Sequence, residues 1–247
     1  MTSSCTDYDT EFQALQNQKY LNWKPWVGEN YKILTGKKLL IVGESHYNEI
    51  TQDLNPDPAE QKGLTRIMIH GNGLCGHGKT KDNKDKPPHR FIRNIEKAMF
   101  NKSSINSTNG KTLWRAVSFY NFVQRPMVSL KHRPDKNDWK NGWETFFKVI
   151  GILQPDYILF CGVSAFQKNF LDEEIKRSCY SYDKKIRKKE EKIKGTSLRT
   201  KGIISIQTHQ SIVTCIRHPS MSFSPKEWHK VINNHMPEYV SWLKSQS

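Results

Sequence analysis

Two segments of this sequence place ionisable side chains at the ends of apolar runs. His218 closely follows the β-branched run 212–216, and Glu44 and His46 closely follow the apolar run 38–42. A histidine and a carboxylate that meet in one site can move protons, activate water or stabilise developing charge on a substrate. These residue types therefore indicate hydrolysis or anion stabilisation.

The two runs have the length and composition of buried strands, as do 114–123, 155–161 and 203–206. Apolar residues at helical spacing predict helices between them, over 7–20, 91–100, 138–152, 164–176 and 226–242. Strands that alternate with helices predict an α/β fold with a mainly parallel, doubly wound sheet. Because parallel strands end at the same edge, Glu44 and His218 are expected in one crevice.

The chain has 247 residues, which we interpret as a single domain over 1–247 with an N-terminal helical and aromatic extension over 1–35. Its net charge is +15, and a basic insertion at 176–201 carries eleven Lys and Arg against three acidic residues. Such a balance favours a polyanionic partner, most simply nucleic acid. The insertion itself is either a solvated surface segment or a nucleic-acid clamp.

Compartment and membrane signals point to an intracellular, cytoplasmic protein. The five cysteines have no disulfide-framework spacing, the polar residues 1–10 do not form a signal peptide, and no apolar run is long enough to span a membrane. His70, Cys75, His77 and His89 could hold zinc, but their spacing fits no standard finger, so we expect no metal.

Four short motifs occur in a telling order. Gly43-Glu44-Ser45-His46-Tyr47 follows a predicted strand, Asn121 precedes Arg125-Pro126, a further strand ends at Gly162, and His218-Pro219-Ser220 comes last. This ordered set, over about residues 36–240, resembles the uracil-DNA glycosylase superfamily. The resemblance implies a three-layer α/β/α fold with a four-stranded, mainly parallel central sheet and DNA at its carboxyl edge.

The first motif combines features of two branches of that superfamily. Glu44 and Ser45 replace the Gln and the water-activating Asp of the best-known branch, whereas Tyr47 matches the tyrosine that excludes a 5-methyl group there. In another branch the motif is Gly-Glu-Ala-Pro and the Glu is catalytic, which Glu44 matches while His46 replaces the proline. The water is therefore activated by Glu44 or by His46.

The resemblance also assigns roles to the other motifs. His218 would stabilise the departing base, and Asn121 would pair with the N3–H and O4 edge of uracil. Phe91 and Phe119, with Tyr120 as a third candidate, could stack on a flipped base. The structural alternatives are a turn-capping His218, an Asn121 that bonds a loop and a Glu44 in a salt bridge or helix cap.

The turn after His218 is expected to contact DNA. Met221 and Phe223 are candidate wedges for the hole left by the flipped base, unless they pack on the last helix. The remaining expected phosphate and backbone contacts are Ser220, Ser222, Arg125 and Arg217.

Together these features predict a DNA glycosylase that hydrolyses the N-glycosidic bond of uracil or another modified base by base flipping. It would be monomeric and free of cofactors, and monofunctional because no lysine lies in the motifs. Two alternatives remain: an inactive DNA-binding or regulatory protein with the same fold, and a hydrolase of small nucleotides.

Overall fold

The computed structural model of the protein describes residues 4–46, 63–71, 89–127, 129, 131–162, 170–177, 180–183, 201–206 and 209–246. Its strands form one mixed sheet in the order β1-β3-β2-β4-β7-β6-β5. The strands are β1 (Trp26–Val27), β2 (Leu39–Gly43), β3 (Val117–Asn121), β4 (Tyr157–Cys161), β5 (Tyr180–Asp183), β6 (Lys201–Ile206) and β7 (His209–Ile216).

The middle of the sheet is parallel and its edges are antiparallel. Strands β3, β2, β4 and β7 run parallel to their neighbours, whereas β1 pairs antiparallel with β3, and β6 and β5 continue antiparallel beyond β7. The expected α/β class is confirmed, but the expectation of four strands is wrong because seven strands form the sheet. The strand expected over 203–206 is β6, whereas the two edge strands, β1 and β5, were not predicted from the sequence.

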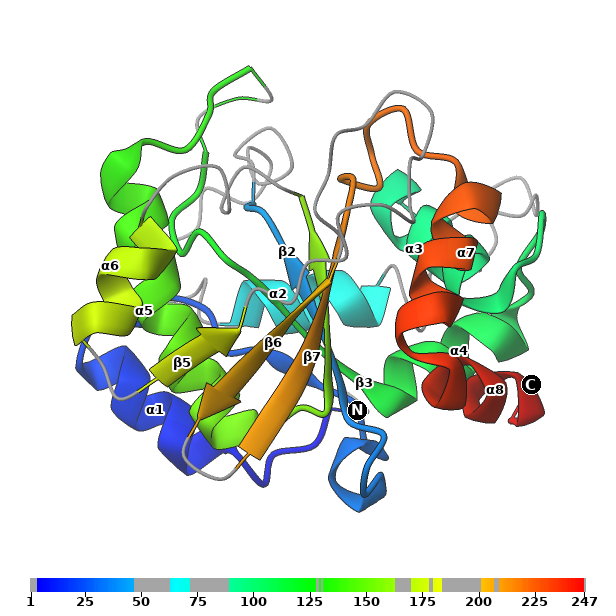
Figure 1. The fold of residues 1–247 in the computed structure, drawn as a ribbon, viewed down its shortest axis with the longest axis horizontal. Helices are drawn as coiled ribbons and strands as arrows, with labels where there is room; N and C mark the ends of the chain where they lie inside the picture. Colours follow the sequence, from blue (N-terminus) through cyan, green and yellow to red (C-terminus); the bar gives the residue numbers. More distant parts are fainter. Residues whose placement is uncertain are drawn as a thin grey trace.

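Helices cover both faces of the sheet (Figure 1). The helices are α1 (Asp9–Asn17), α2 (Leu64–Ile69), α3 (Arg90–Phe100), α4 (Ser107–Ala116), α5 (Lys136–Leu153), α6 (Phe170–Arg177), α7 (Pro225–His235) and α8 (Pro237–Ser245), with a 3-10 turn η1 (Tyr31–Ile33). Helices α3, α4, α7 and α8 belong to one apolar cluster, and α1, α5 and α6 to the other. The layers are therefore helix, sheet and helix.

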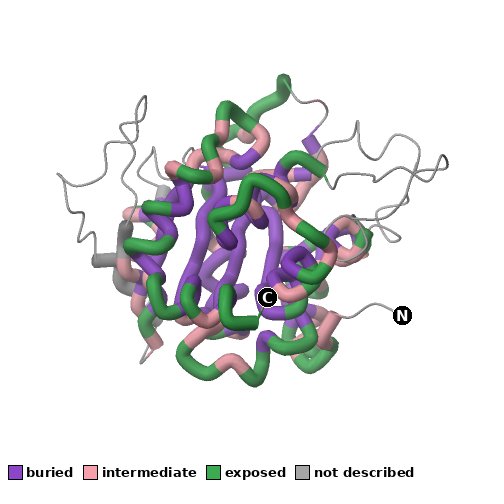
Figure 2. Tube along the Cα trace, turned by 90° about the vertical axis from the view of Figure 1, so that its right-hand side faces the viewer, coloured by how far each residue is buried: buried purple, intermediate pink, exposed green. Residues whose placement is uncertain are grey.

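Strand β2 shows why the sheet has a core on each side. Leu39 and Ile41 belong to one cluster, whereas Leu40 and Val42 belong to the other, because successive strand residues point to opposite faces. All five residues of β2 are buried, and Figure 2 shows the buried strands at the centre of the molecule. The continuous apolar run thus reflects a strand that is covered on both faces.

Two predicted elements have different bounds in the structure. The strand expected over 114–123 covers only Val117–Asn121, since α4 occupies Ser107–Ala116. The Asn106 side chain accepts a hydrogen bond from the Asn109 N–H at 2.8 Å and so caps the start of α4. The sequence analysis did not use this cap, because the residues at 114–123 are of types that favour strands. The helix expected over 226–242 is two helices, because Pro237 cannot continue the first one.

The remaining elements mostly follow the sequence pattern. The helices expected over 7–20, 91–100 and 138–152 correspond to α1, α3 and α5. Of the helix expected over 164–176, α6 begins at Phe170, and residues 163–169 lie outside the described ranges. Helix α2 lies between β2 and α3 in the chain, and the N-terminal aromatic segment joins the sheet through β1.

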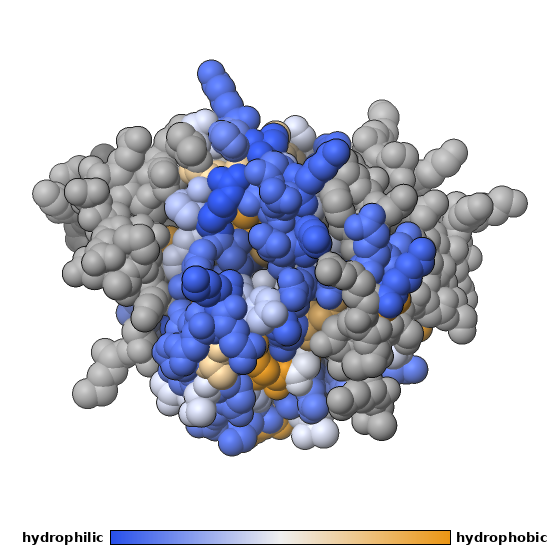
Figure 3. Space-filling view, turned by 90° about the vertical axis from the view of Figure 1, so that its left-hand side faces the viewer, coloured by the Kyte–Doolittle hydropathy of each residue, from blue (hydrophilic) through white to orange (hydrophobic). Residues whose placement is uncertain are grey.

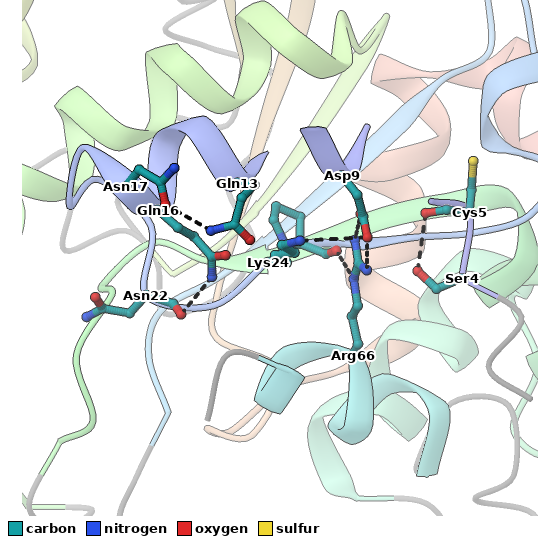
Figure 4. A network of polar contacts seen from close by, with 10 residues as sticks. Ser4, Cys5, Asp9, Gln13, Gln16, Asn17, Asn22, Lys24 and Arg66 are labelled. Carbon is teal, nitrogen blue, oxygen red and sulfur yellow. Dashed lines mark hydrogen bonds and ion pairs between the residues drawn. The ribbon is translucent and has the colours of Figure 1, made fainter. Parts of the chain in front are cut away.

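Ionic contacts attach α2 to the N-terminal segment (Figure 4). Arg66 of α2 donates through Nη1 to Asp9 Oδ2 at 3.0 Å and through Nε to the Pro25 carbonyl at 2.9 Å. Lys24 lies 3.8 Å from the same Asp9 carboxylate. This arrangement fixes α2 beside β1 and β3.

The surface over the α1, α5 and α6 layer is mainly hydrophilic where it is described (Figure 3). These helices direct their apolar residues to the sheet, so polar residues remain outside. Within the described part of the chain, none of the helices is both long and apolar enough to cross a membrane.

Candidate active site at the carboxyl edge of the sheet

The parallel strands deliver the predicted motifs to one edge of the sheet. Gly43 at the end of β2 is in register with Asn121 at the end of β3, and Cys161 of β4 is in register with Ile216 of β7. Glu44 and His218 follow these strand ends directly or within two residues. The sheet register therefore brings together the motifs that the sequence analysis expected in one crevice.

The end of β2 lies directly against the side chain of Asn121. A Cβ at Gly43 would overlap Asn121 Oδ1 and would lie 3.0 Å from Phe119 Cζ, so only glycine fits between them. Asn121 is 4% exposed, and its side-chain amide makes no hydrogen bond with the described residues. Its backbone carbonyl accepts from Gln124 Nε2 at 2.5 Å. An amide held in place without a protein partner is suited to pair with a ligand.

His218 is held by the turn that it begins. Its Nδ1 accepts a hydrogen bond from the Ser220 N–H at 3.3 Å, and its carbonyl accepts from the Met221 N–H at 2.9 Å. Asn94 of α3 fixes the same turn by donating to the Pro219 carbonyl at 2.7 Å. A ring that accepts at Nδ1 carries its proton on Nε2, which leaves Nε2–H available as a donor.

The surroundings of His218 keep the ring neutral. Burial, together with smaller contributions from Arg133 and His89, lowers the pKa of His218 to about 4. The ring is therefore uncharged near neutral pH. It can donate one hydrogen bond to an anion without carrying a charge of its own.

Of the three aromatic candidates, Phe91 is the one beside His218, and Tyr120 is fully buried in β3. The Phe91 and His218 ring centroids are 5.4 Å apart, and Phe91 is 8% exposed at the first turn of α3. Phe119 is 1% exposed and packs against Phe91 and Trp114, at ring distances of 5.8 and 6.2 Å. Phe119 therefore supports the Phe91 ring from the core, and the expectation that it contacts a base is not supported, because its position in β3 directs it inward.

Glu44 follows the end of β2 and lies near Arg133 and Gly162. Its side chain is 10% exposed, and Oε1 is 3.5 Å from Arg133 Nη1. Burial raises the pKa of Glu44, whereas the Arg133 charge lowers it. Gly162 adopts φ +123°, and a Cβ there would lie 3.5 Å from Glu44 Oε2. The carboxylate is thus enclosed on one side and ion-paired on the other.

The next three residues of the first motif point elsewhere or are not described. His46 is 6% exposed, with Nε2 3.0 Å from Thr65 Oγ1 and its ring edge-on to Trp23 at 4.7 Å. Burial lowers its pKa to about 3. His46 is thus buried against Thr65 of α2 and Trp23, and its expected role as a base or phosphate contact stays a prediction. Ser45 Oγ is buried with no partner among the described residues, and Tyr47 lies outside them.

Arg125 is engaged in a structural contact. Its Nε and Nη2 donate to the two carboxylate oxygens of Asp138 at 2.6 and 2.7 Å, and Asp135 lies 3.5 Å away. Asp135 and Asp138 form the capping box of α5. Arg125 therefore fastens the loop after β3 to α5, and its expected contact with DNA stays a prediction.

The turn after His218 divides into an exposed and a packed part. Met221 is 54% exposed, and Arg217 Nη1 donates to the Ser222 carbonyl at 3.3 Å on the surface. Phe223 stacks on Trp228 of α7, with ring centroids 6.0 Å apart and planes 12° apart. Met221 is thus exposed enough to act as a wedge. Phe223 instead packs on a C-terminal helix, which was the alternative to its expected role as a wedge.

Sequence reasoning missed Arg133 and Asn94. Arg133 lies in a short polar segment with no motif around it, so only its position across the sheet edge reveals it. Asn94 gave a usable signal, since it is a polar residue on the apolar face of the helix 91–100. No cluster of three metal-ligating side chains occurs among the described residues, and Cys75 and His77 lie outside them.

Comparisons with known proteins do not assign the chain to a family. No family model matches the sequence. A search of curated proteins likewise gives no match.

Proposed function

We propose that this protein is a DNA glycosylase that hydrolyses the N-glycosidic bond of uracil or another modified base, as the resemblance to the uracil-DNA glycosylase superfamily implies. The observation that carries the proposal is the convergence of Glu44, Asn121 and His218 from three parallel strands. Phe91 adds an aromatic ring beside His218. The site therefore combines a hydrogen-bond donor for an anion, an amide that can pair with a base, a carboxylate and an aromatic ring, and few reactions need all four groups.

His218 would stabilise the departing base. Cleavage of the base–sugar bond leaves negative charge on the base, and a pyrimidine carries it partly on O2. The free Nε2–H of His218 can donate to that oxygen, and the neutral ring needs no proton transfer to do so. The turn that holds His218 keeps this donor in place throughout the reaction.

Asn121 would recognise the base. Its amide has one acceptor and two donors, which complement the N3–H and O4 of uracil. Cytosine presents the opposite arrangement, so the same amide would meet donor against donor and acceptor against acceptor. Because Gly43 confines the amide, recognition would be geometrically strict.

Glu44 would act on the sugar side of the bond. An ionised carboxylate can orient or deprotonate the attacking water and can stabilise a cationic sugar. The Arg133 ion pair favours that ionised form, which opposes the effect of burial. No catalytic lysine enters this scheme, so the product would be an intact strand with an abasic site.

The overall charge of +15 fits a polyanionic substrate, and we propose DNA inside the cell as the partner of a monomeric enzyme. Free thiols at Cys5, Cys161 and Cys215 agree with a reducing compartment.

The test is alkali-induced strand scission of labelled oligonucleotides that carry uracil, hypoxanthine, xanthine or a modified cytosine, single- and double-stranded. We expect cleavage at one of these bases, with a loss of about 100-fold or more in His218→Ala. Glu44→Gln should lose activity as well. Matched controls are His132→Ala and Glu29→Gln, which remove an exposed histidine and an exposed carboxylate elsewhere.

Two results would contradict the proposal. One is absence of cleavage at every base while DNA is still bound in a gel shift, which would favour an inactive DNA-binding protein. The other is turnover of free nucleosides or nucleotides without DNA, which would favour a hydrolase of small nucleotides.

A further inference from the structure

Arg133 is an exposed cation at the mouth of the candidate site. Its side chain is 61% exposed, although the Glu44 side chain that it approaches is 10% exposed. The Nη1–Oε1 distance of 3.5 Å is longer than the 2.7–2.9 Å typical of charge-assisted hydrogen bonds. A guanidinium has five N–H donors, so this single long contact leaves most of its donors facing solvent.

The backbone that carries Arg133 is firmly held. Pro134 follows it and fixes the next φ angle, and Asp135 then caps α5. Arg125 bonds both oxygens of Asp138 in the same cap. The loop therefore presents Arg133 from a fixed base, which limits the entropy lost when the side chain binds a ligand.

Arg133 also acts on His218, since its charge contributes to the lowered pKa of that ring. The guanidinium thus lies within electrostatic range of both Glu44 and His218. Among the described residues, His89 also acts on His218, and Arg93 acts on His89.

We propose that Arg133 binds a backbone phosphate of the nucleic acid while it remains paired with Glu44. A planar guanidinium suits two anions at once, because its N–H groups point in different directions within one plane. Arg133 would then fix the strand beside Glu44 and His218. The choice of phosphate as the ligand rests on the proposed function.

The experiment measures binding without catalysis. A labelled duplex with a tetrahydrofuran abasic site, which has no base to release, is titrated by fluorescence anisotropy over a series of salt concentrations. The variants are Arg133→Gln and Arg133→Lys. The matched control is Arg115→Gln, because Arg115 is also exposed and paired with a carboxylate, Glu29, at 3.1 Å. Arg115 lies near the end of α4, two residues before the start of β3 and so at the opposite edge of the sheet.

We expect Arg133→Gln to weaken binding about tenfold and to reduce the slope of log K against log salt by about 0.9, the value for one lost phosphate contact. Arg133→Lys should retain the slope, since the charge remains, and lose part of the affinity. Arg115→Gln should change neither quantity measurably. Equal melting temperatures would show that the variants are folded.

Each outcome bears on a different claim. If Arg133→Gln behaves like Arg115→Gln, the phosphate contact is disproved and the glycosylase proposal is unaffected. If Arg133→Gln weakens binding as expected but no base is ever cleaved, the contact stands and the glycosylase proposal fails. If the wild-type protein does not bind the duplex at any salt concentration, the phosphate contact is overturned.

Discussion

At the residue scale, the missing side chain of Gly43 decides where Asn121 can lie. We expect Gly43→Ala to displace the Asn121 amide, because the new methyl group would overlap its Oδ1. The free energy of unfolding should fall by about 2 kcal/mol, as in other overpacked cores. The measurement is urea unfolding together with the cleavage assay.

Gly151→Ala provides the control for Gly43→Ala. Gly151 lies within α5, and a Cβ there meets no atom within 4 Å. This variant should gain up to about 1 kcal/mol, because alanine is the better helix former. Full activity in Gly43→Ala would show that the position of Asn121 does not matter for the reaction.

His46 makes stability depend on pH. Burial lowers its pKa from 6.5 to about 3, so between these values the unfolded chain binds a proton that the folded chain does not. Its contribution to stability is complete above pH 6.5 and is lost as the pH falls toward 3.

We therefore expect His46→Gln to flatten the fall in unfolding free energy between pH 6.5 and 4, measured by urea unfolding at several pH values. His132→Gln, which replaces an exposed histidine, should leave that slope unchanged. An unchanged slope in His46→Gln would mean that His46 is protonated in the folded protein.

At the element scale, Arg125 links the loop after β3 to the start of α5. Arg125→Gln would leave the Asp138 carboxylate, whose side chain is 8% exposed, without its cation. We expect a loss of about 1–2 kcal/mol, less than for a fully buried pair because Arg125 itself is 38% exposed. Urea unfolding measures this change.

The salt dependence of DNA binding separates the structural role of Arg125 from a direct contact. In Arg125→Gln the slope should stay close to that of the wild-type protein, because the guanidinium is engaged with Asp138. A decrease of about 0.9 would restore the original expectation that Arg125 contacts phosphate.

Helices α3 and α4 are joined by a buried carboxyl group. Glu96 is fully buried and accepts from Trp114 Nε1 at 2.9 Å, and burial raises its pKa to about 8. The folded protein keeps this proton while the unfolded chain loses it above pH 4.5, so the stability that Glu96 provides falls as the pH rises from 4.5 to 8.

Glu96→Gln keeps the oxygen that Trp114 contacts and cannot ionise. We subtract the unfolding free energy of the wild-type protein from that of Glu96→Gln at each pH. We expect this difference to be larger at pH 9 than at pH 5.5. Glu29→Gln, on the surface, serves as the control. A constant difference between the two pH values would show that Glu96 is ionised in the fold.

At the scale of the whole molecule, the antiparallel hairpin of β5 and β6 extends the parallel sheet. Asp183 pairs with Ile203, so the two strands lie side by side where residues 184–200 connect them. These residues include eight Lys and Arg and two Glu, a net charge of +6 out of +15. Residues 184–200 thus carry much of the net charge of the chain.

Replacing 184–200 with Asn-Gly, a common hairpin turn, should leave the melting temperature within about 2 °C. DNA affinity should fall and its salt dependence should weaken, because several phosphate-neutralising charges are removed. Unchanged affinity, measured by anisotropy, would identify the segment as a solvated surface insertion.

The sequence by itself determined the four parallel strands, strand β6 and most helices of this protein, because the spacing of apolar residues and the presence of turn residues are local properties. It also located Glu44, Asn121 and His218, since each closely follows or ends an apolar strand. It could not count the strands, because β1 is a two-residue strand whose partner is far along the chain.

Only the tertiary structure decided which polar side chains reach the crevice. His46 and Glu44 are two residues apart, yet one packs under α2 against Thr65 and the other faces Arg133. Arg125 and Arg133 are likewise close in sequence, but Asp138 engages the first and leaves the second at the open edge. These outcomes depend on partners from distant segments, and the free energy of burying or pairing a charge is set by those partners rather than by the local sequence.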